Sequence, residues 1–144
     1  MTVDVEILSE VSGEVVEAFA RLLPQLSTSA RQLDAAGLAA IVAAPASTLL
    51  IARVGGQIVG TLTLVTFPIP TGVRAWIEDV VTDESARGKG VASALIDEAI
   101  RQAKNASART IDLSSRPSRS AAGDLYERLG FEQRETRMYR YKLT

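Results

Sequence analysis

The sequence predicts a single domain of mixed α/β class, in which helices pack on a largely antiparallel sheet. Its 144 residues are 47% hydrophobic and 23% charged, which is the composition and size of one folded globular domain. Strand-like and helix-like segments follow one another in the order β-α-α-β-β-β-α-β-α-β-β. The longest helix lies between two strands, so we expect at least one parallel crossover.

The N-terminal part of the chain predicts a strand and two helices. Alternating apolar residues over 3–7 indicate a short strand. Ser12 is expected to cap a helix that ends at Pro24, because proline cannot continue the helical hydrogen bonds. An Ala-rich stretch from Asp34 to Ala44 predicts the second helix.

Two strands and a tight turn follow. Residues 48–54 and 58–67 are rich in β-branched and aliphatic side chains, and Gly55-Gly56 between them is a favoured hairpin turn. Residues 68–72 carry two prolines and a glycine, so we expect them to end the second strand.

The next strand, Val73 to Thr82, carries acidic residues in its middle. Strict alternation places Trp76, Glu78 and Val80 on one face and Asp79 on the other, unless a bulge changes the phase. At most one of these two neighbouring carboxylates can therefore face a given site, and we choose Glu78 as the candidate, with Asp79 on the opposite side. A solvated or Arg-paired carboxylate is the structural alternative for Glu78, and Trp76 could line a pocket or fill the core.

The C-terminal half predicts the remaining elements. A long amphipathic helix begins after Gly90 and is followed by a strand over 110–114. The last helix, 120–129, stops at Gly130, which is the expected C-terminal cap. Two closing strands are predicted over 131–135 and 137–143.

Composition excludes several classes of chemistry. The chain has no Cys and no His, so a thiol nucleophile, a Cys or His zinc site and a Ser-His-Asp triad are excluded. Sixteen Lys and Arg against seventeen Asp and Glu give a net charge of −1, which offers no overall field for nucleic acid or anionic membrane. We expect no metal, and the lack of a signal peptide or membrane span at the sequence level makes cytoplasmic location the expectation.

The turn Arg87-Gly88-Lys89-Gly90 has the features of an anion site. It joins a strand to a helix whose first amides lack intrahelical partners, its glycines allow close approach, and Arg87 and Lys89 add positive charge. The alternative is that the glycines only serve a tight turn. A P-loop is excluded because positions 83 and 90 are Asp83 and Gly90, and a dinucleotide fingerprint fails at Ser93.

Three segments together resemble the GNAT superfamily of acetyl-CoA-dependent N-acetyltransferases. The segment Arg87-Gly88-Lys89-Gly90-Val91-Ala92 is similar to the family's coenzyme A pyrophosphate signature. The segment Ile77-Glu78-Asp79-Val80-Val81-Thr82 lies where the family has a splayed strand that pairs with the pantetheine arm. The segment from Ala122 to Phe131 resembles the family's closing helix, with Tyr126 beside the cofactor sulfur.

The resemblance implies a GNAT-like fold and assigns roles to these residues. Cofactor contacts would come from Val80, Val81, Thr82, Arg87, Gly88, Lys89, Gly90, Val91 and Ala92. Arg119 stands where many members have Asn, and an Arg there could pair with a cofactor phosphate. Tyr126, which periodicity alone would place in the core, would act on the departing thiolate.

The implied reaction is direct acetyl transfer to an amine of a small molecule or peptide. Glu78, Asp79 or water would take up the amine proton, and Val80 would supply a backbone N–H for the developing oxyanion. The alternative from another class is a non-catalytic acyl-CoA-binding or interaction module on the same fold. The alternating tail from Met138 to Leu143 could supply a sheet edge, which predicts a homodimer.

Overall fold

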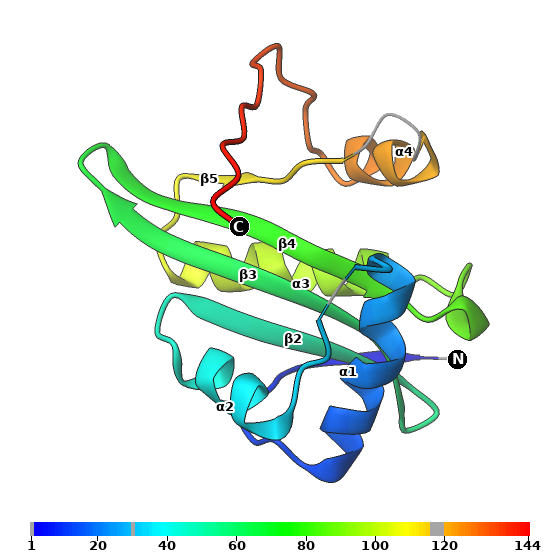
Figure 1. Ribbon diagram of the computed structural model, residues 1–144. Helices are drawn as coiled ribbons and strands as arrows, with labels where there is room; N and C mark the ends of the chain where they lie inside the picture. The colour runs from blue at the N-terminus through cyan, green and yellow to red at the C-terminus, as the bar shows by residue number, and fades with distance from the viewer. Residues whose placement is uncertain (1, 30, 116–119) are drawn as a thin grey trace. The chain divides into compact units, whose positions relative to one another are not determined.

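The structure is a computed structural model that describes residues 2–29, 31–115 and 120–144 (Figure 1). It forms two compact units, residues 1–113 and 114–144. The larger unit contains, in chain order, β1 (Val3–Ile7), α1 (Gly13–Leu26), α2 (Ala35–Ala43), β2 (Ser47–Val54), β3 (Gln57–Ile69), β4 (Gly72–Thr82), the 3₁₀ turn η1 (Glu84–Ala86), α3 (Val91–Asn105) and β5 (Thr110–Asp112). The smaller unit contains α4 (Ser120–Arg128).

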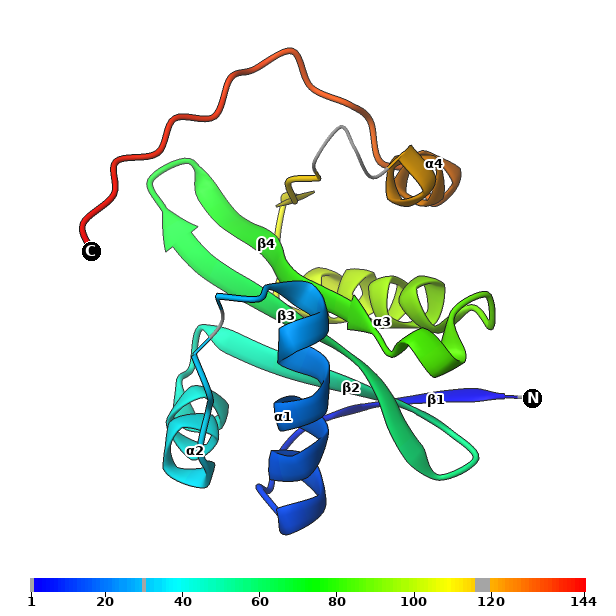
Figure 2. The ribbon, with the colours of Figure 1, turned by 45° about the vertical axis from the view of Figure 1, so that its right-hand side comes forward.

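The larger unit is built on a five-stranded sheet in the order β1-β2-β3-β4-β5 (Figures 1 and 2). The first four strands are antiparallel neighbours, and β5 pairs with β4 in parallel after the chain has crossed over through α3. This arrangement confirms the predicted mixed α/β class and the parallel crossover.

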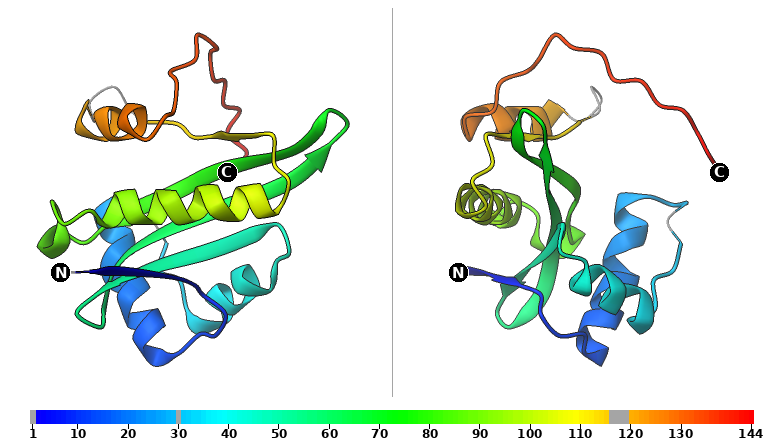
Figure 3. Two further views of the ribbon diagram at one scale, coloured as in Figure 1. Left: turned by 180° about the vertical axis from the view of Figure 1, so that it is seen from behind. Right: turned by 90° about the vertical axis from the view of Figure 1, so that its left-hand side faces the viewer.

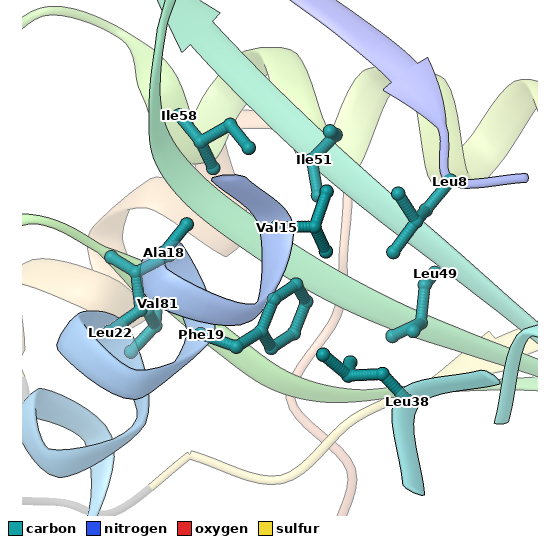
Figure 4. Close-up of a cluster of buried hydrophobic side chains, with 10 residues drawn as sticks. All are labelled: Leu8, Val15, Ala18, Phe19, Leu22, Leu38, Leu49, Ile51, Ile58 and Val81. Atoms are coloured by element: carbon teal, nitrogen blue, oxygen red, sulfur yellow. The ribbon is translucent and has the colours of Figure 1, made fainter. Parts of the chain in front are cut away.

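Helices cover both faces of the sheet, with α1 and α2 on one face and α3 on the other (Figure 3). On the α1 face, apolar side chains from both helices meet those of the strands and of Leu8 (Figure 4). This cluster consists of Leu8, Val15, Ala18, Phe19, Leu22, Leu38, Leu49, Ile51, Ile58 and Val81. Its burial of large apolar side chains is the main force that holds α1 against the sheet.

Two of the predicted helix starts are confirmed by their caps. The Ser12 Oγ accepts a hydrogen bond from the Val15 amide at 3.3 Å, and the Asp34 Oδ1 accepts one from the Gly37 amide at 2.8 Å. Among the described residues no helix is long and apolar enough to cross a membrane.

The prediction that Pro24 ends the first helix was wrong, because α1 continues through it to Leu26. Proline removes one backbone bond there, but the Ser27 amide still donates to the Leu23 carbonyl and Leu26 packs against the core cluster. The break expected at Pro68 was also wrong. This residue lies where β3 has run past the end of β2, so its missing N–H removes no ladder bond on that side.

The two closing strands predicted over 131–135 and 137–143 are not formed. A strand needs a partner for its backbone groups, and α4 is the one regular element in the described part of the smaller unit. The alternation that suggested these strands instead leaves Met138, Tyr139, Tyr141 and Leu143 exposed.

Candidate active site

A β-bulge interrupts β4 in the middle of its acidic segment. Thr63 pairs with Glu78 and Thr61 pairs with Val81, so Leu62 of β3 lies opposite two residues, Asp79 and Val80. Asp79 adopts a φ of 52°, which is uncommon for a residue other than glycine. A bulge takes one residue out of the ladder and leaves its backbone groups without a strand partner.

The bulge changes which side chains share a face. Thr61 and Thr63 are two residues apart on β3, so their partners Val81 and Glu78 lie on one face although they are three residues apart. Val81 belongs to the core cluster under α1, which places Glu78 on the α1 side of the sheet. The expectation that Val80 shares this face is therefore corrected, because strict alternation ends at the bulge.

Glu78 is held by a neighbour on its own strand. The indole Nε1 of Trp76 donates a hydrogen bond to the Glu78 Oε2 at 2.6 Å. Trp76 is half-buried and Glu78 is exposed, so this carboxylate is oriented while it remains open to solvent. Asp79 is exposed as well.

The outer edge of β4 is open beside the bulge. The strand β5 pairs with Arg74, Ala75 and Trp76, and no other described strand pairs with β4 on that side. The parallel pairing therefore stops at Trp76, where β5 ends at Asp112, and no described strand pairs with residues 77–82 on this side, so their backbone could pair with an extended ligand.

The turn after β4 begins with an ordered carboxylate. The Asp83 Oδ1 accepts hydrogen bonds from the Ser85 amide at 3.0 Å and from the Ser85 hydroxyl at 3.1 Å, and these bonds cap η1. The Ser85 amide, followed by the Arg21 guanidinium and the Ser85 hydroxyl, holds the pKa of Asp83 below its usual value, although burial opposes this shift. Asp83 is therefore a charged, buried start to the turn.

Both glycines of the turn have left-handed backbone, with φ of 79° at Gly88 and at Gly90. A Cβ at either position would meet nothing within 4 Å, so conformation rather than crowding favours glycine. Gly90 is the N-cap of α3, and Arg87 and Lys89 on either side of Gly88 are exposed. The first amides of α3, the helix dipole and two cationic side chains thus meet at an open surface, which is an arrangement suited to a phosphate group.

Tyr126 lies on α4 in the smaller unit, two residues before the helix ends at Arg128. Its carbonyl accepts the Phe131 amide at 3.0 Å, while the Gly130 amide donates to the Glu127 carbonyl at 3.1 Å. These two bonds form a Schellman cap, with Gly130 at a φ of 99°. The rings of Tyr126 and Phe131 pack edge to face with 5.9 Å between their centroids, so the cap also fixes the tyrosine ring.

The larger unit therefore brings Glu78, the bulge at Val80 and the turn from Arg87 to Ala92 into one continuous strand-turn-helix segment. Tyr126 belongs to the other unit, and Arg119 lies outside the described residues. Among the described residues there is no group of three or more Asp and Glu side chains placed to hold a metal ion.

Gly60 of β3, which faces the first turns of α3, was not predicted from the sequence as a residue that bears on the site. A Cβ on Gly60 would lie 2.7 Å from the Val91 Cγ1 and 3.2 Å from the Leu95 Cδ1. Glycine at this position lets the first turns of α3 approach the sheet closely. An isolated glycine inside a strand is a recognised signal of such an approach and could have identified it.

Comparison with known proteins gives consistent matches. Residues 14–131 match the sequence model of the acetyltransferase (GNAT) family. An uncharacterized N-acetyltransferase of Methanocaldococcus jannaschii is 38% identical over 61 residues, a stretch that spans 42% of this chain and 27% of that protein's length.

Solved structures match over nearly the whole chain, among them the following two. A protein of Agrobacterium tumefaciens str. C58, provisionally named an acetyltransferase, has a TM-score of 0.84 and 28% identity, covering 96% of this chain and 99% of its own. A ribosomal-protein-alanine N-acetyltransferase of Brucella melitensis biovar Abortus 2308 has a TM-score of 0.79 and 25% identity, covering 99% of this chain and 100% of its own.

Proposed function

We propose that this chain, which belongs to the acetyltransferase (GNAT) family, transfers an acetyl group from acetyl-CoA directly to an amine of a small molecule or peptide. The observation that carries the proposal is the turn with left-handed Gly88 and Gly90 at the start of α3. It offers converging amides and positive charge at an open surface, which suit a pyrophosphate better than a carboxylate or a neutral group.

The chain's residues fit coenzyme A along a path that follows β4 into the turn. Arg87, Gly88, Lys89, Gly90, Val91 and Ala92 would hold the pyrophosphate. The backbone of Val80, Val81 and Thr82 would pair with the pantetheine arm, because this edge of β4 has no described strand beside it. Arg119 is proposed as a phosphate contact from the family resemblance alone. When bound, acetyl-CoA supplies the acetyl group as a thioester.

Three groups of the chain would carry the chemistry. Glu78, directly or through water, would take the proton from an amine that arrives mostly as ammonium, since alkylamines have a pKa of about 10.4. The amide of Val80 at the bulge would donate to the negative charge that builds on the acetyl oxygen, an effect typically of about 3 kcal/mol per donor. The C–N bond would form first, and Tyr126 would donate its proton to the departing sulfur as the C–S bond then breaks, with the second proton lost by the amine nitrogen returning to the tyrosine oxygen through water.

Isothermal titration with acetyl-CoA tests the cofactor part of this proposal. We expect micromolar binding by the wild-type protein, weakened at least tenfold by Arg87→Ala and by Gly90→Asp. Arg101→Ala, which removes an exposed cation elsewhere on α3, controls for charge. Gly56→Asp controls for strain, because Gly56 has a φ of 82°, lies in the hairpin turn between β2 and β3, and would have nothing within 4 Å of an added Cβ. A folded wild-type protein that does not bind acetyl-CoA would refute the proposal.

The rival function is a non-catalytic acyl-CoA-binding module. Presence of both Tyr126 and Glu78 favours catalysis. A panel of amines that includes small polyamines and peptide N-termini, assayed for acetyl transfer and for thioester hydrolysis, separates the two. Tight acetyl-CoA binding with no turnover on any amine would favour the module.

A further inference from the structure

The first residues of the turn that we propose to bind the pyrophosphate are hydrogen-bonded to α1. Arg21 of α1 donates from Nε to the Asp83 Oδ2 at 3.0 Å and from Nη2 to the Ile58 carbonyl at 2.6 Å. Ile58 lies near the start of β3 and Asp83 immediately follows β4. The Arg21 guanidinium therefore links the start of β3 to the residue at which the chain leaves β4 and enters the turn.

The carboxylate of Asp83 connects the Arg21 guanidinium to the turn itself. Its Oδ2 accepts from Arg21, while its Oδ1 accepts from the amide and hydroxyl of Ser85 inside η1. The Asp83 amide donates to the Val59 carbonyl at 2.7 Å, which extends the pairing between the ends of β3 and β4. A change in the position of Arg21 would therefore move the Asp83 side chain, and with it Ser85 and the 3₁₀ turn η1.

A second contact lies one helical turn further along α1. The Gln25 Oε1 accepts a hydrogen bond from the Glu84 amide at 3.0 Å, and its Nε2 donates to the Arg21 carbonyl at 3.2 Å. Glu17, one turn before Arg21, accepts two bonds from the Arg21 Nη1 at 2.8 and 2.9 Å. Three successive turns of α1 therefore take part in one network that ends on the turn after β4.

This network exceeds what is needed to hold α1 on the sheet. Val15, Ala18, Phe19 and Leu22 already bury α1 in the core cluster. Partly exposed ion pairs such as Arg21–Glu17 contribute little to global stability. Because the Arg21 fork fixes direction as well as distance, its contribution is to geometry.

We propose that Arg21 and Gln25 are positioning residues for the coenzyme A turn, acting through Asp83 and Glu84. The identity of the ligand in this inference rests on the proposed function. The coupling between α1 and the turn does not. With the start of the turn fixed by α1 and its end fixed by α3, the amides of residues 88–92 converge before the ligand arrives. Preorganised donors bind more tightly because less freedom is lost on binding.

Arg53 offers a closely matched control. Its guanidinium also contacts two carboxylates and one carbonyl, those of Glu6, Glu14 and Gly56, but this cluster joins β1, β2 and the opposite end of α1. Its side chain is 25% exposed against 38% for Arg21. Arg53→Ala therefore removes a similar network without touching the turn.

The test combines hydrogen exchange of the free protein with acetyl-CoA titration of Arg21→Ala, Gln25→Ala and Arg53→Ala. We expect amide exchange in residues 84–92 to rise several-fold in the first two variants and to match wild type in Arg53→Ala. The Kd for acetyl-CoA should rise about tenfold in Arg21→Ala and about threefold in Gln25→Ala, with Arg53→Ala within twofold of wild type. If Arg21→Ala does not fold, Gln25→Ala still tests whether α1 orders the turn.

The possible failures are distinguishable. Unchanged exchange over residues 84–92 in the folded variants, or equal losses of affinity in Arg21→Ala and Arg53→Ala, would overturn the positioning role. If wild-type protein does not bind acetyl-CoA, the proposed function fails, while the exchange data alone still decide whether α1 orders the turn.

Discussion

The indole of Trp76 and the carboxylate of Glu78 form a hydrogen-bonded pair along β4, with 2.6 Å between Nε1 and Oε2. They lie two residues apart on one face of the strand, immediately before the bulge at Asp79 and Val80. Since Glu78 is exposed, the indole restricts its rotamers without removing it from water. A base held in this way can receive a proton from an acceptor amine or from water beside it.

Glu78→Gln tests whether this carboxylate is the base. We expect kcat to fall by about 10²-fold or more with little change in the Kd for acetyl-CoA, because general-base catalysis typically contributes 10²- to 10⁴-fold. Asp79→Asn is the matched control, since Asp79 is the adjacent exposed carboxylate. A larger loss in Asp79→Asn would transfer the role to Asp79, and small losses in both would leave water as the proton acceptor.

Trp76→Phe tests whether Trp76 orients the Glu78 carboxylate or only packs in the core. Phenylalanine keeps most of the apolar ring but cannot donate to Glu78, so we expect kcat to fall about three- to tenfold while thermal stability changes little. Steady-state kinetics with an identified amine, alongside thermal unfolding, provide the measurement. A large drop in melting temperature with unchanged activity in the folded protein would instead assign Trp76 to the core.

Tyr126→Phe tests the proposed proton donor. We expect kcat to fall about 10- to 100-fold while the Kd for acetyl-CoA stays within twofold, because the proposed role of the hydroxyl is to protonate the sulfur as it departs, a step that follows cofactor binding. Retention of the ring preserves the edge-to-face contact with Phe131. Tyr139→Phe is the control, since Tyr139 is an 87% exposed tyrosine of the same unit. Equal kinetics in the two variants would exclude Tyr126 from the chemistry.

Local signals in the sequence predicted the parts of the fold that depend on neighbouring residues. Ser12 and Asp34 cap helices through their own side chains, and Gly130 closes α4 because its backbone must be left-handed. The turn glycines, Gly88 and Gly90, were recognised for the same reason. These features need no information about distant parts of the chain.

The features that the sequence did not predict depend on contacts between residues that are distant in sequence. The bulge at Asp79 exists only in relation to Leu62 of β3, so alternation within β4 could not reveal it. Arg21 and Asp83 are 62 residues apart, and neither has a local pattern that indicates the other. The failed prediction of strands after Phe131 has the same origin, because alternation describes a segment but does not provide its partner.

The exposed tail predicts self-association. Met138, Tyr139, Tyr141 and Leu143 are between 66% and 89% exposed, which is unusual for large apolar side chains grouped in one short segment. We expect sedimentation velocity to show a dimer, and Tyr139→Ser combined with Tyr141→Ser to shift the protein toward monomer. A wild-type monomer at all working concentrations would refute this prediction.

Gly60→Ala should destabilise the protein by about 1–3 kcal/mol and weaken acetyl-CoA binding. The added methyl would lie 2.7 Å from the Val91 Cγ1 and 3.1 Å from the Val81 carbonyl oxygen, so the start of α3 must move away from the sheet. Gly13→Ala is the control, because a Cβ there meets nothing within 4 Å. Urea unfolding should show little loss for Gly13→Ala, and equal losses in the two variants would contradict the packing argument.

Asp83→Asn should make the protein less stable at neutral pH but not at low pH. The pKa of Asp83 is lowered in the folded protein by the Ser85 amide and by Arg21, whereas in the unfolded chain it returns to about 3.9. A lowered folded pKa gives stability that is fully present above about pH 4 and is lost as the pH falls through the folded value. Urea unfolding of both proteins at pH 7, 5 and 3 should therefore show a gap on the order of 1 kcal/mol at the first two values that narrows at the third. A gap that stays constant down to pH 3 would mean that the charge of Asp83 does not stabilise the turn, and that the loss comes from replacing one of its two acceptor oxygens with an NH2 donor.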